Sequence, residues 1–509
     1  MREKKIGDCR LLSDSLCAIV MIQAEPAEAS LPRRANDDAA GPGNLILNPE
    51  IERKTMTKQL SRNNLTEGTV WKRLLVFFLP IAAGTCIQQL YNAVDGLILG
   101  RFVGTVALAA VGGSSAQIIN LLIGFFVAFT AGASVVISQL YGSGRADDVQ
   151  DASGNAIAVF GLLGVLLMAF GLAGTPEMLR LLKTPEETVP QAVLYLRIYF
   201  LGVPFVLILN MESNMLRAVG DSVSPFVYMV AGCVTNIVLD AVFVIVFHWG
   251  IVGAAAATVA AQVLNTALLT WKLMTTKETY RLRLRDLKLR SGYLKSMLRL
   301  GIPSGLQSSM YAVSNMIIQV GVNSLGTVVV ASWVMSGKTD GIFWAVSSAL
   351  GAAIMSFVGQ NLGAGRGDRV KECAKQGMIL SVVITLCLSG LILLSGRPLL
   401  RLLTKDQAVR DTTWLIMLYF VPFYFTWSVV EVLSAVLRGS GDAVRPVVIT
   451  GLGICLFRVI WIYTLFAKVH ALLVLSLCYP VSWVLTGLAM FIYYRRGSWK
   501  QNGKLIVER

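Results

Sequence analysis

The feature that most constrains the fold of this chain is a series of apolar segments, each about 20 residues long or longer, from residue 74 onward. Segments of this length cross the roughly 30 Å hydrocarbon core of a bilayer as helices, because irregular backbone facing lipid would lack hydrogen-bond partners. Charged residues make up only 15% of the 509 residues, too few to cover a soluble protein of this length. We therefore expect an all-α membrane protein with twelve transmembrane helices. Their approximate ranges are 74–97, 106–138, 152–175, 191–215, 225–247, 252–274, 297–322, 328–358, 374–396, 411–436, 444–467 and 471–494.

The basic residues of the loops predict the orientation in the membrane. From Lys58 onward, about 26 Lys and Arg fall on the side that holds both chain ends, against about 9 on the other side. Basic loops stay in the cytoplasm, so we expect a multi-pass protein of the cell (inner) membrane with both termini cytoplasmic. We therefore expect the net charge of +15 to orient the chain in the membrane and to contact anionic membrane lipids. We expect no nucleic-acid partner, because aromatic residues do not interleave with the basic ones.

Composition divides the chain into five regions. Residues 1–65 are expected to be a disordered N-terminal extension, because a run such as EPAEASLPRRANDDAAGPGN cannot build a core. Met56 offers a second plausible start, so the sequence leaves open whether residues 1–55 are translated. The remaining regions are an N-terminal six-helix lobe, a basic cytoplasmic linker, a C-terminal six-helix lobe and a cytoplasmic tail, at residues 66–275, 276–296, 297–495 and 496–509.

Two sequence motifs recur at one spacing and indicate an internal repeat. QLYGSGRADDV begins at Gln139 and returns as QNLGAGRGDRV at Gln360. LRAVGDSVSP begins at Leu216 and returns as LRGSGDAVRP at Leu437, so both motifs return after the same interval along the chain. Each half contains an even number of spans, so both halves enter the membrane with the same polarity. Such a parallel repeat predicts two bundles around a central cleft, the place where alternating-access transporters bind substrate.

These two pairs of motifs, on two six-helix halves, resemble the multidrug and toxic compound extrusion (MATE) family. The resemblance covers about residues 65–495. It implies a monomeric antiporter, coupled to H⁺ or Na⁺ and without another cofactor, that exports small organic, cationic amphipathic compounds. A lipid-linked oligosaccharide flippase from a related branch is the alternative. An enzyme is not expected, because neither an HExxH nor a GxSxG motif occurs.

Few ionisable residues lie inside the predicted spans, and each is a functional candidate because a charge in the bilayer is costly. The N-terminal half has Asp95 and, on one helical face, Asn236 and Asp240. Two carboxylates and an amide suit either a hard cation such as Na⁺ or a shared proton. Thr258 could add a hydroxyl ligand. The resemblance implies the same four positions, since some MATE members place a cation site there.

The C-terminal half carries a different set of charges. Lys338 and Asp340 lie in the eighth predicted span, Glu431 in the tenth and Arg458 in the eleventh. We expect a charge network of two compensating pairs, Lys338 with Asp340 and Glu431 with Arg458, because burying unpaired charge is costly. Several aromatic residues of this half could line a drug pocket or simply pack, namely Trp333, Phe343, Trp344, Tyr424, Phe425 and Trp427.

Overall fold

The computed structural model describes residues 65–497, which form helices joined by turns and contain no strand within that range. The predicted N-terminal extension, up to residue 64, and all but the start of the predicted tail lie outside the described residues. The described residues form one compact unit. The N-terminal half of the described chain contains α3 (Val70–Ile98), η1 (Leu99–Val103), α4 (Thr105–Ala110), η2 (Val111–Ser115), α5 (Ala116–Gly142), α6 (Ala146–Leu181), α7 (Val189–Ala218), α8 (Val223–Asp240), η3 (Ala241–Val246) and α9 (Gly250–Thr275).

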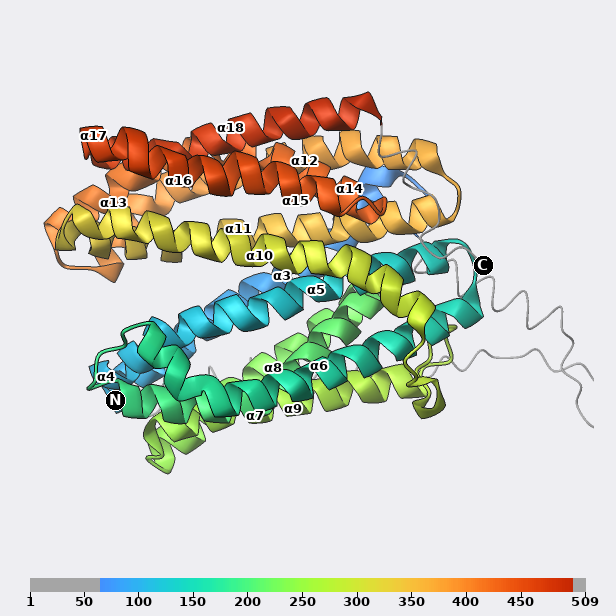
Figure 1. Ribbon diagram of the computed structural model, residues 1–509, viewed down its shortest axis with the longest axis horizontal. Coiled ribbons are helices and arrows are strands. Elements are labelled where there is room, and N and C mark those ends of the chain that lie inside the picture. Colours follow the sequence, from blue (N-terminus) through green and yellow to red (C-terminus); the bar gives the residue numbers. More distant parts are fainter. Residues whose placement is uncertain (1–64, 498–509) are drawn as a thin grey trace, which may run out of the picture. The chain divides into compact units, whose positions relative to one another are not determined.

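The C-terminal half begins after a connecting segment that contains one short turn of 3₁₀ helix. That turn is η4 (Leu284–Asp286), and the elements of the C-terminal half are α10 (Ser291–Ser324), α11 (Thr327–Gly363), α12 (Gly367–Leu403), α13 (Gln407–Phe420), η5 (Val421–Phe423), α14 (Tyr424–Gly439), α15 (Val444–Thr450), η6 (Gly451–Leu456), α16 (Phe457–Trp461), η7 (Ile462–Phe466), α17 (Ala467–Val469) and α18 (Leu472–Arg496). Figure 1 shows the helices of the two halves running side by side, with α3 and α5 next to α10 and α11.

Eleven helical stretches of the described chain are long and apolar enough to cross a membrane. The remaining predicted span, the seventh at 297–322, coincides with α10, which is helical but more polar. Its polar side chains include Gln307, Asn315 and Gln319. All twelve predicted spans therefore fall on helices, and Asn315 and Gln319 of α10 line a cavity described below.

Most helices extend beyond the predicted spans, because tight turns join them. α5 ends and α6 begins around Gly144, whose φ is 73°, and α11 and α12 meet in the same way around Gly365, whose φ is 72°. Only glycine adopts this backbone conformation without strain. These two turns occupy equivalent positions in the two copies of the first repeated motif, so the sequence repeat is also a repeat of backbone geometry.

Prolines interrupt several spans at repeat-related places. Pro80, Pro204 and Pro303 lie inside α3, α7 and α10, where each removes one backbone hydrogen bond. At Pro422 the tenth span changes from α13 to a short 3₁₀ turn before continuing as α14. Of these four prolines, only Pro422 coincides with a change of helix type.

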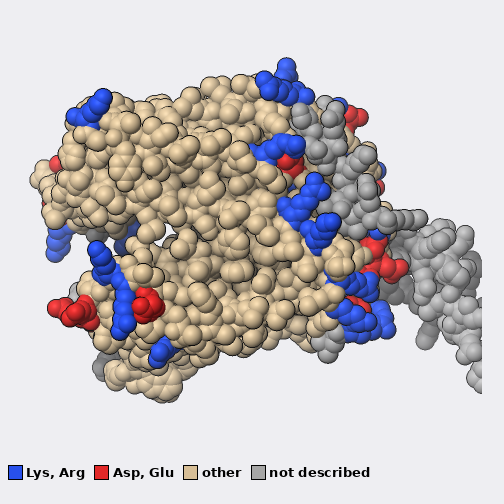
Figure 2. Space-filling view, in the orientation of Figure 1, with Lys and Arg blue, Asp and Glu red and all other residues tan. Residues whose placement is uncertain are grey.

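The two halves meet closely at one end, which we call the basic end and define by the connections 143–145, 219–222, 276–290, 364–366 and 440–443. Figure 2 shows Lys and Arg gathered toward this end and the surface hollowed between the halves toward the other. A side chain at Gly142 would collide with the backbone of Gln360, and one at Gly363 with the backbone of Gln139. The two glycines therefore allow the backbones of the two halves to touch.

A pair of hydrogen bonds, which we call the glutamine latch, joins the halves at the basic end. Gln139 Nε2 donates to the Gly439 carbonyl at 3.1 Å, and Gln360 Nε2 donates to the Ala218 carbonyl at 2.7 Å. Both glutamines are buried, and both acceptors lie at the ends of helices, where carbonyls lack intrahelical partners. The two glutamines occupy equivalent positions of the repeat, and so do the two acceptors. The two hydrogen bonds of the latch are therefore related to each other by the internal repeat.

The basic linker is attached to α6. Asn155 Nδ2 donates to the carbonyls of Lys288 and Arg290 at 3.0 and 3.2 Å. Asp148 accepts from Tyr293 at 2.6 Å, and Asp151 pairs with Arg290. Although Asp147, Asp148 and Asp151 have the DDxxD spacing of diphosphate-binding enzymes, two of these carboxylates serve here to hold the linker.

Candidate functional site

The first candidate site lies between α3 and α8 in the N-terminal half, which pack against each other. Asp240 and Asn236 sit one turn apart on α8 and are only 1% and 2% exposed. Asp95 lies on α3 and interacts electrostatically with Asp240. Two carboxylates and an amide thus come from two helices that pack together, and their role as a cation-coupling site stays a prediction.

Four polar atoms of this cluster are buried without a hydrogen-bond partner among the described residues. They are Asp95 Oδ1, Asp240 Oδ1 and both Oδ1 and Nδ2 of Asn236. Buried polar atoms in proteins are nearly always hydrogen-bonded, because leaving one unpaired costs about 1–3 kcal/mol. The cluster therefore offers three oxygen atoms that are ready to accept a ligand.

Both helices change their winding just beyond the cluster. The π-helical segment η1 begins at Leu99, four residues after Asp95, and η3 begins at Ala241, directly after Asp240. π-Helical turns insert an extra residue into a helix and occur frequently at functional sites. Asp240 therefore lies at the junction of α8 with η3, and Asp95 lies one turn before η1.

Thr258 is the fourth residue predicted for this site. Its Oγ1 donates to the Ala254 carbonyl of its own helix, α9, at 3.0 Å. α9 packs against α8, but the described structure gives Thr258 no hydrogen bond to the three other residues. Its hydroxyl has already donated its proton and retains only the capacity to accept.

Tyrosines beside the cluster were not predicted. Tyr91 of α3 and Tyr195 of α7 both interact electrostatically with Asp95 and Asp240. The ring of Tyr199 lies 6.0 Å from that of Tyr195. The sequence does not indicate that these tyrosines lie near the two carboxylates, because α7 is brought to the site only by tertiary packing.

The charges of the C-terminal half are not paired as predicted. Lys338 is exposed and Asp340 is buried, and no ion pair joins them in the described structure. Residues two apart on a helix point to different faces, which explains the difference. Glu431 Oε1 lies 3.9 Å from a guanidinium nitrogen of Arg438 and forms no ion pair with Arg458 in the described structure. The predicted pairs are therefore wrong as contacts, and Arg458 has a different environment.

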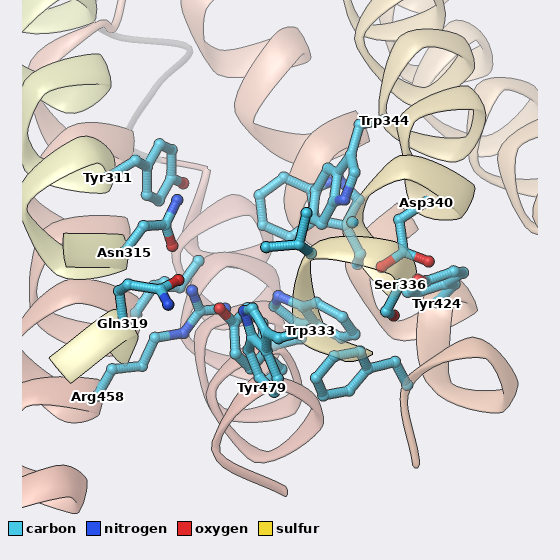
Figure 3. A pocket seen from close by; sticks show the side chains of 16 residues that line it. Tyr311, Asn315, Gln319, Trp333, Ser336, Asp340, Trp344, Tyr424, Arg458 and Tyr479 are labelled. Atoms are coloured by element: carbon cyan, nitrogen blue, oxygen red, sulfur yellow. The ribbon is translucent and has the colours of Figure 1, made fainter. Parts of the chain in front are cut away.

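A cavity of about 600 Å³ lies inside the C-terminal half. Its walls come from α10, α11, α14, α16 and α18, together with Phe420 at the end of α13 and Ile454 of η6, and Figure 3 shows aromatic side chains around it. Four of the six aromatic residues considered from the sequence line it, namely Trp333, Trp344, Tyr424 and Trp427. Phe343 instead stacks on Tyr424 with 4.0 Å between ring centroids, and Phe425 is 40% exposed. The cavity also contains both Asp340 and Arg458.

Comparison with known families identifies the fold. The MatE family model matches this chain twice, at residues 80–242 and 303–464, so each half matches separately. The chain belongs to the MATE family. The double match confirms the internal repeat, and the family consists of transporters and not of enzymes.

Relatives of this MATE protein are named as drug exporters. It is 32% identical to a probable multidrug resistance protein, YpnP, of Bacillus subtilis, over 88% of this chain and 99% of that protein. It is 23% identical to the multidrug export protein MepA of Staphylococcus aureus, over 69% of this chain and 77% of MepA. These relatives do not favour the flippase alternative.

Solved structures agree with the fold of this MATE protein. A multidrug resistance MATE family transporter in an outward-facing conformation superimposes with a TM-score of 0.80 at 21% identity, covering 86% of this chain and 98% of that one. A MATE protein in the straight conformation superimposes with a TM-score of 0.78 at 21% identity, covering 86% of this chain and 98% of that one. The chain is thus a multipass membrane protein with the MATE fold.

Proposed function

We propose that this protein is an antiporter that exports small organic, cationic amphipathic compounds in exchange for inward movement of H⁺ or Na⁺. The observation that carries the proposal is the cluster of four unpartnered polar atoms on Asp95, Asn236 and Asp240. Buried acceptors of this kind in a membrane helix bundle suit a cation that is bound and released during transport. The relatives named as multidrug proteins support the export of organic compounds.

The cation would act by neutralising buried charge. Asp95 and Asp240 lie on different helices and repel each other when both are ionised. A bound Na⁺ or proton removes this repulsion and favours closer packing of α3 against α8. Cation and exported compound would then prefer different conformations, and only such a difference in affinity shifts a conformational equilibrium.

Asn236 and Thr258 would serve as neutral groups. Asn236 Oδ1 lacks a partner and would accept or coordinate the cation. Thr258 Oγ1 donates to its own helix and would contribute only a lone pair. Asn236 is therefore expected to contribute more than Thr258.

The conformation fits one stage of an alternating-access cycle. The glutamine latch and the glycine contacts close the basic end, and the surface is hollowed toward the other end. We propose that the basic end and both termini face the cytoplasm and that one chain forms the complete transport unit. The arrangement would then be the outward-open state, ready to release its compound.

The test uses full-length protein in liposomes with an ethidium-type dye and an imposed H⁺ or Na⁺ gradient. Asp240→Asn should abolish gradient-driven dye movement, because the amide is nearly isosteric and removes the charge. Asn236→Ala should weaken transport less, and Thr258→Ala least. Asp147→Asn is the matched control, since this exposed carboxylate lies outside the cluster.

The same experiment identifies the coupling ion. Transport that follows the Na⁺ gradient, with Na⁺ stabilising the purified protein but not its Asp240→Asn variant, would assign Na⁺. Transport that follows only the pH gradient would assign H⁺. Gradient-driven transport that survives in both Asp95→Asn and Asp240→Asn would refute the proposed coupling site.

A further inference from the structure

The cavity in the C-terminal half contains one charged group of each sign, and these groups do not pair with each other. Arg458 is 5% exposed and Asp340 is 8% exposed, and both line the cavity. Figure 3 shows them on opposite sides of it, with Trp333 between. No ion pair within 4 Å involves either residue in residues 65–497.

Arg458 is held in place but is not neutralised. Its Nε donates to Ser482 Oγ at 3.2 Å, which is its one hydrogen bond in the described chain. Its guanidinium lies 4.0 Å from the ring centroid of Tyr479. Arginine remains charged in proteins, and a buried guanidinium without an anion is costly. The remaining guanidinium nitrogens are available for an anionic group in the cavity.

Asp340 forms the opposite end of the cavity. Its Oδ1 has no hydrogen-bond partner in the described structure, nor does Oγ of Ser336, one turn earlier on α11. The phenol of Tyr424 lies beside the carboxylate (Figure 3). A carboxylate with a neighbouring unpartnered hydroxyl suits a cationic or hydrogen-bond-donating group.

The space between the two charges is aromatic. The rings of Trp333 and Tyr479 lie 5.9 Å apart, and those of Trp344 and Trp427 lie 5.1 Å apart. Aromatic walls bind flat apolar bodies, and about 600 Å³ lies within the range of sites for drug-sized molecules. The cavity therefore combines a flat apolar interior with a positive end and a negative end.

We propose that this cavity binds aromatic zwitterions, with the anionic group on Arg458 and the cationic group on Asp340. Such a compound neutralises both buried charges at once, whereas a simple organic cation leaves Arg458 without an anion. The inference rests on the proposed export function and narrows its substrates to aromatic compounds that carry an anionic group in addition to the cationic one. It assigns this class to the C-terminal half, apart from the coupling cluster in the N-terminal half.

A matched pair of fluorescent dyes tests the proposal. Rhodamine 110 carries a free carboxylate and a cationic ring system, and rhodamine 123 is its methyl ester, which has only the cation. Binding to purified full-length protein is followed by fluorescence polarisation without any ion gradient. The wild type should bind rhodamine 110 at least about tenfold more tightly than rhodamine 123, as expected for a charge-assisted contact in a dry site.

Substitutions assign the preference to the two charges. Arg458→Gln should remove the preference by weakening rhodamine 110 about tenfold or more with little change for rhodamine 123, and Arg458→Lys should keep part of it. Asp340→Asn should weaken both dyes, because both carry the cation. The control Arg397→Gln removes an arginine that also lies over an aromatic ring, Trp414, but outside the cavity.

The outcomes distinguish this inference from the proposed function. Equal binding of the two dyes by the wild type, or an unchanged preference in a folded Arg458→Gln protein, would overturn the inference. Because no gradient is present, failure of coupled transport would leave the dye comparison intact. The two proposals therefore fail separately.

Discussion

Replacing both glutamines of the latch, Gln139→Ala together with Gln360→Ala, should open the basic end of the protein. Each substitution removes a side-chain amide that donates to a carbonyl of the opposite half, at 3.1 Å for Gln139 and 2.7 Å for Gln360. The accepting carbonyls belong to Gly439 and Ala218, where α14 and α7 end. In the closed form these carbonyls would stay buried without a partner, and in an open form water would reach them.

The magnitude follows from the cost of an unpaired buried carbonyl. Each lost contact should disfavour the closed form by about 1–3 kcal/mol. The two contacts involve different residues, so to a first approximation their effects add to about 2–6 kcal/mol. Even the lower value shifts the ratio of open to closed forms about 30-fold.

Spin labels at Asp147→Cys and Asp368→Cys, in a protein without other cysteines, measure this opening by double electron–electron resonance. The two positions are exposed, lie in opposite halves and are equivalent in the repeat. The double alanine variant should gain a population at longer distance, and each single variant a smaller one. Gln376→Ala is the control, because its amide donates to Glu372 on its own helix. An unchanged distance distribution in the double variant would refute the idea that the latch holds this end closed.

Three further substitutions follow from packing at other places. Gly142→Val should lengthen the same label distance, since its side chain would meet the backbone of the opposite half, and an unaltered distance would contradict the close approach. Asn155→Ala should speed tryptic cleavage of the linker, because two hydrogen bonds that hold it are lost; an equal cleavage rate would mean that the linker is held by other contacts. Phe343→Ala should destabilise the protein by about 3–5 kcal/mol by removing the ring stacked on Tyr424. The midpoint of thermal unfolding in detergent should fall for this variant but not for Phe425→Ala, whose ring is 40% exposed.

The arrangement of the spans could be predicted because it depends on local properties of the sequence. The length of each apolar segment determines whether it crosses a membrane, and both glycine turns, at Gly144 and Gly365, occur at the repeat spacing. The ends of the helices were less predictable. α11 and α12 continue through polar residues beyond the expected spans, since a helix needs no apolar side chains outside the bilayer.

Asp95, Asn236 and Asp240 could be selected as candidates because they are rare polar side chains in apolar segments, and their role in coupling stays a prediction. The pairing in the C-terminal half could not be predicted, because Glu431 and Arg458 lie on elements whose rotation and depth are decided by packing. The latch gave no signal either. Gln139 and Gln360 lie in polar motifs beside turns, and their partners are backbone carbonyls, which every residue possesses. Side-chain chemistry alone does not identify such a contact.

The symmetry of the latch has a consequence for the origin of the chain. Each half supplies one glutamine and one helix-end carbonyl, and each glutamine meets the carbonyl of the other half. This reciprocal arrangement is an isologous interface, the kind formed by two identical subunits around a two-fold axis. A single six-helix ancestor could therefore have assembled as a homodimer with both copies inserted in the same direction. Fusion of the two copies would then have freed one of them to acquire Arg458 and the other Asp240 without losing the contact that joins them.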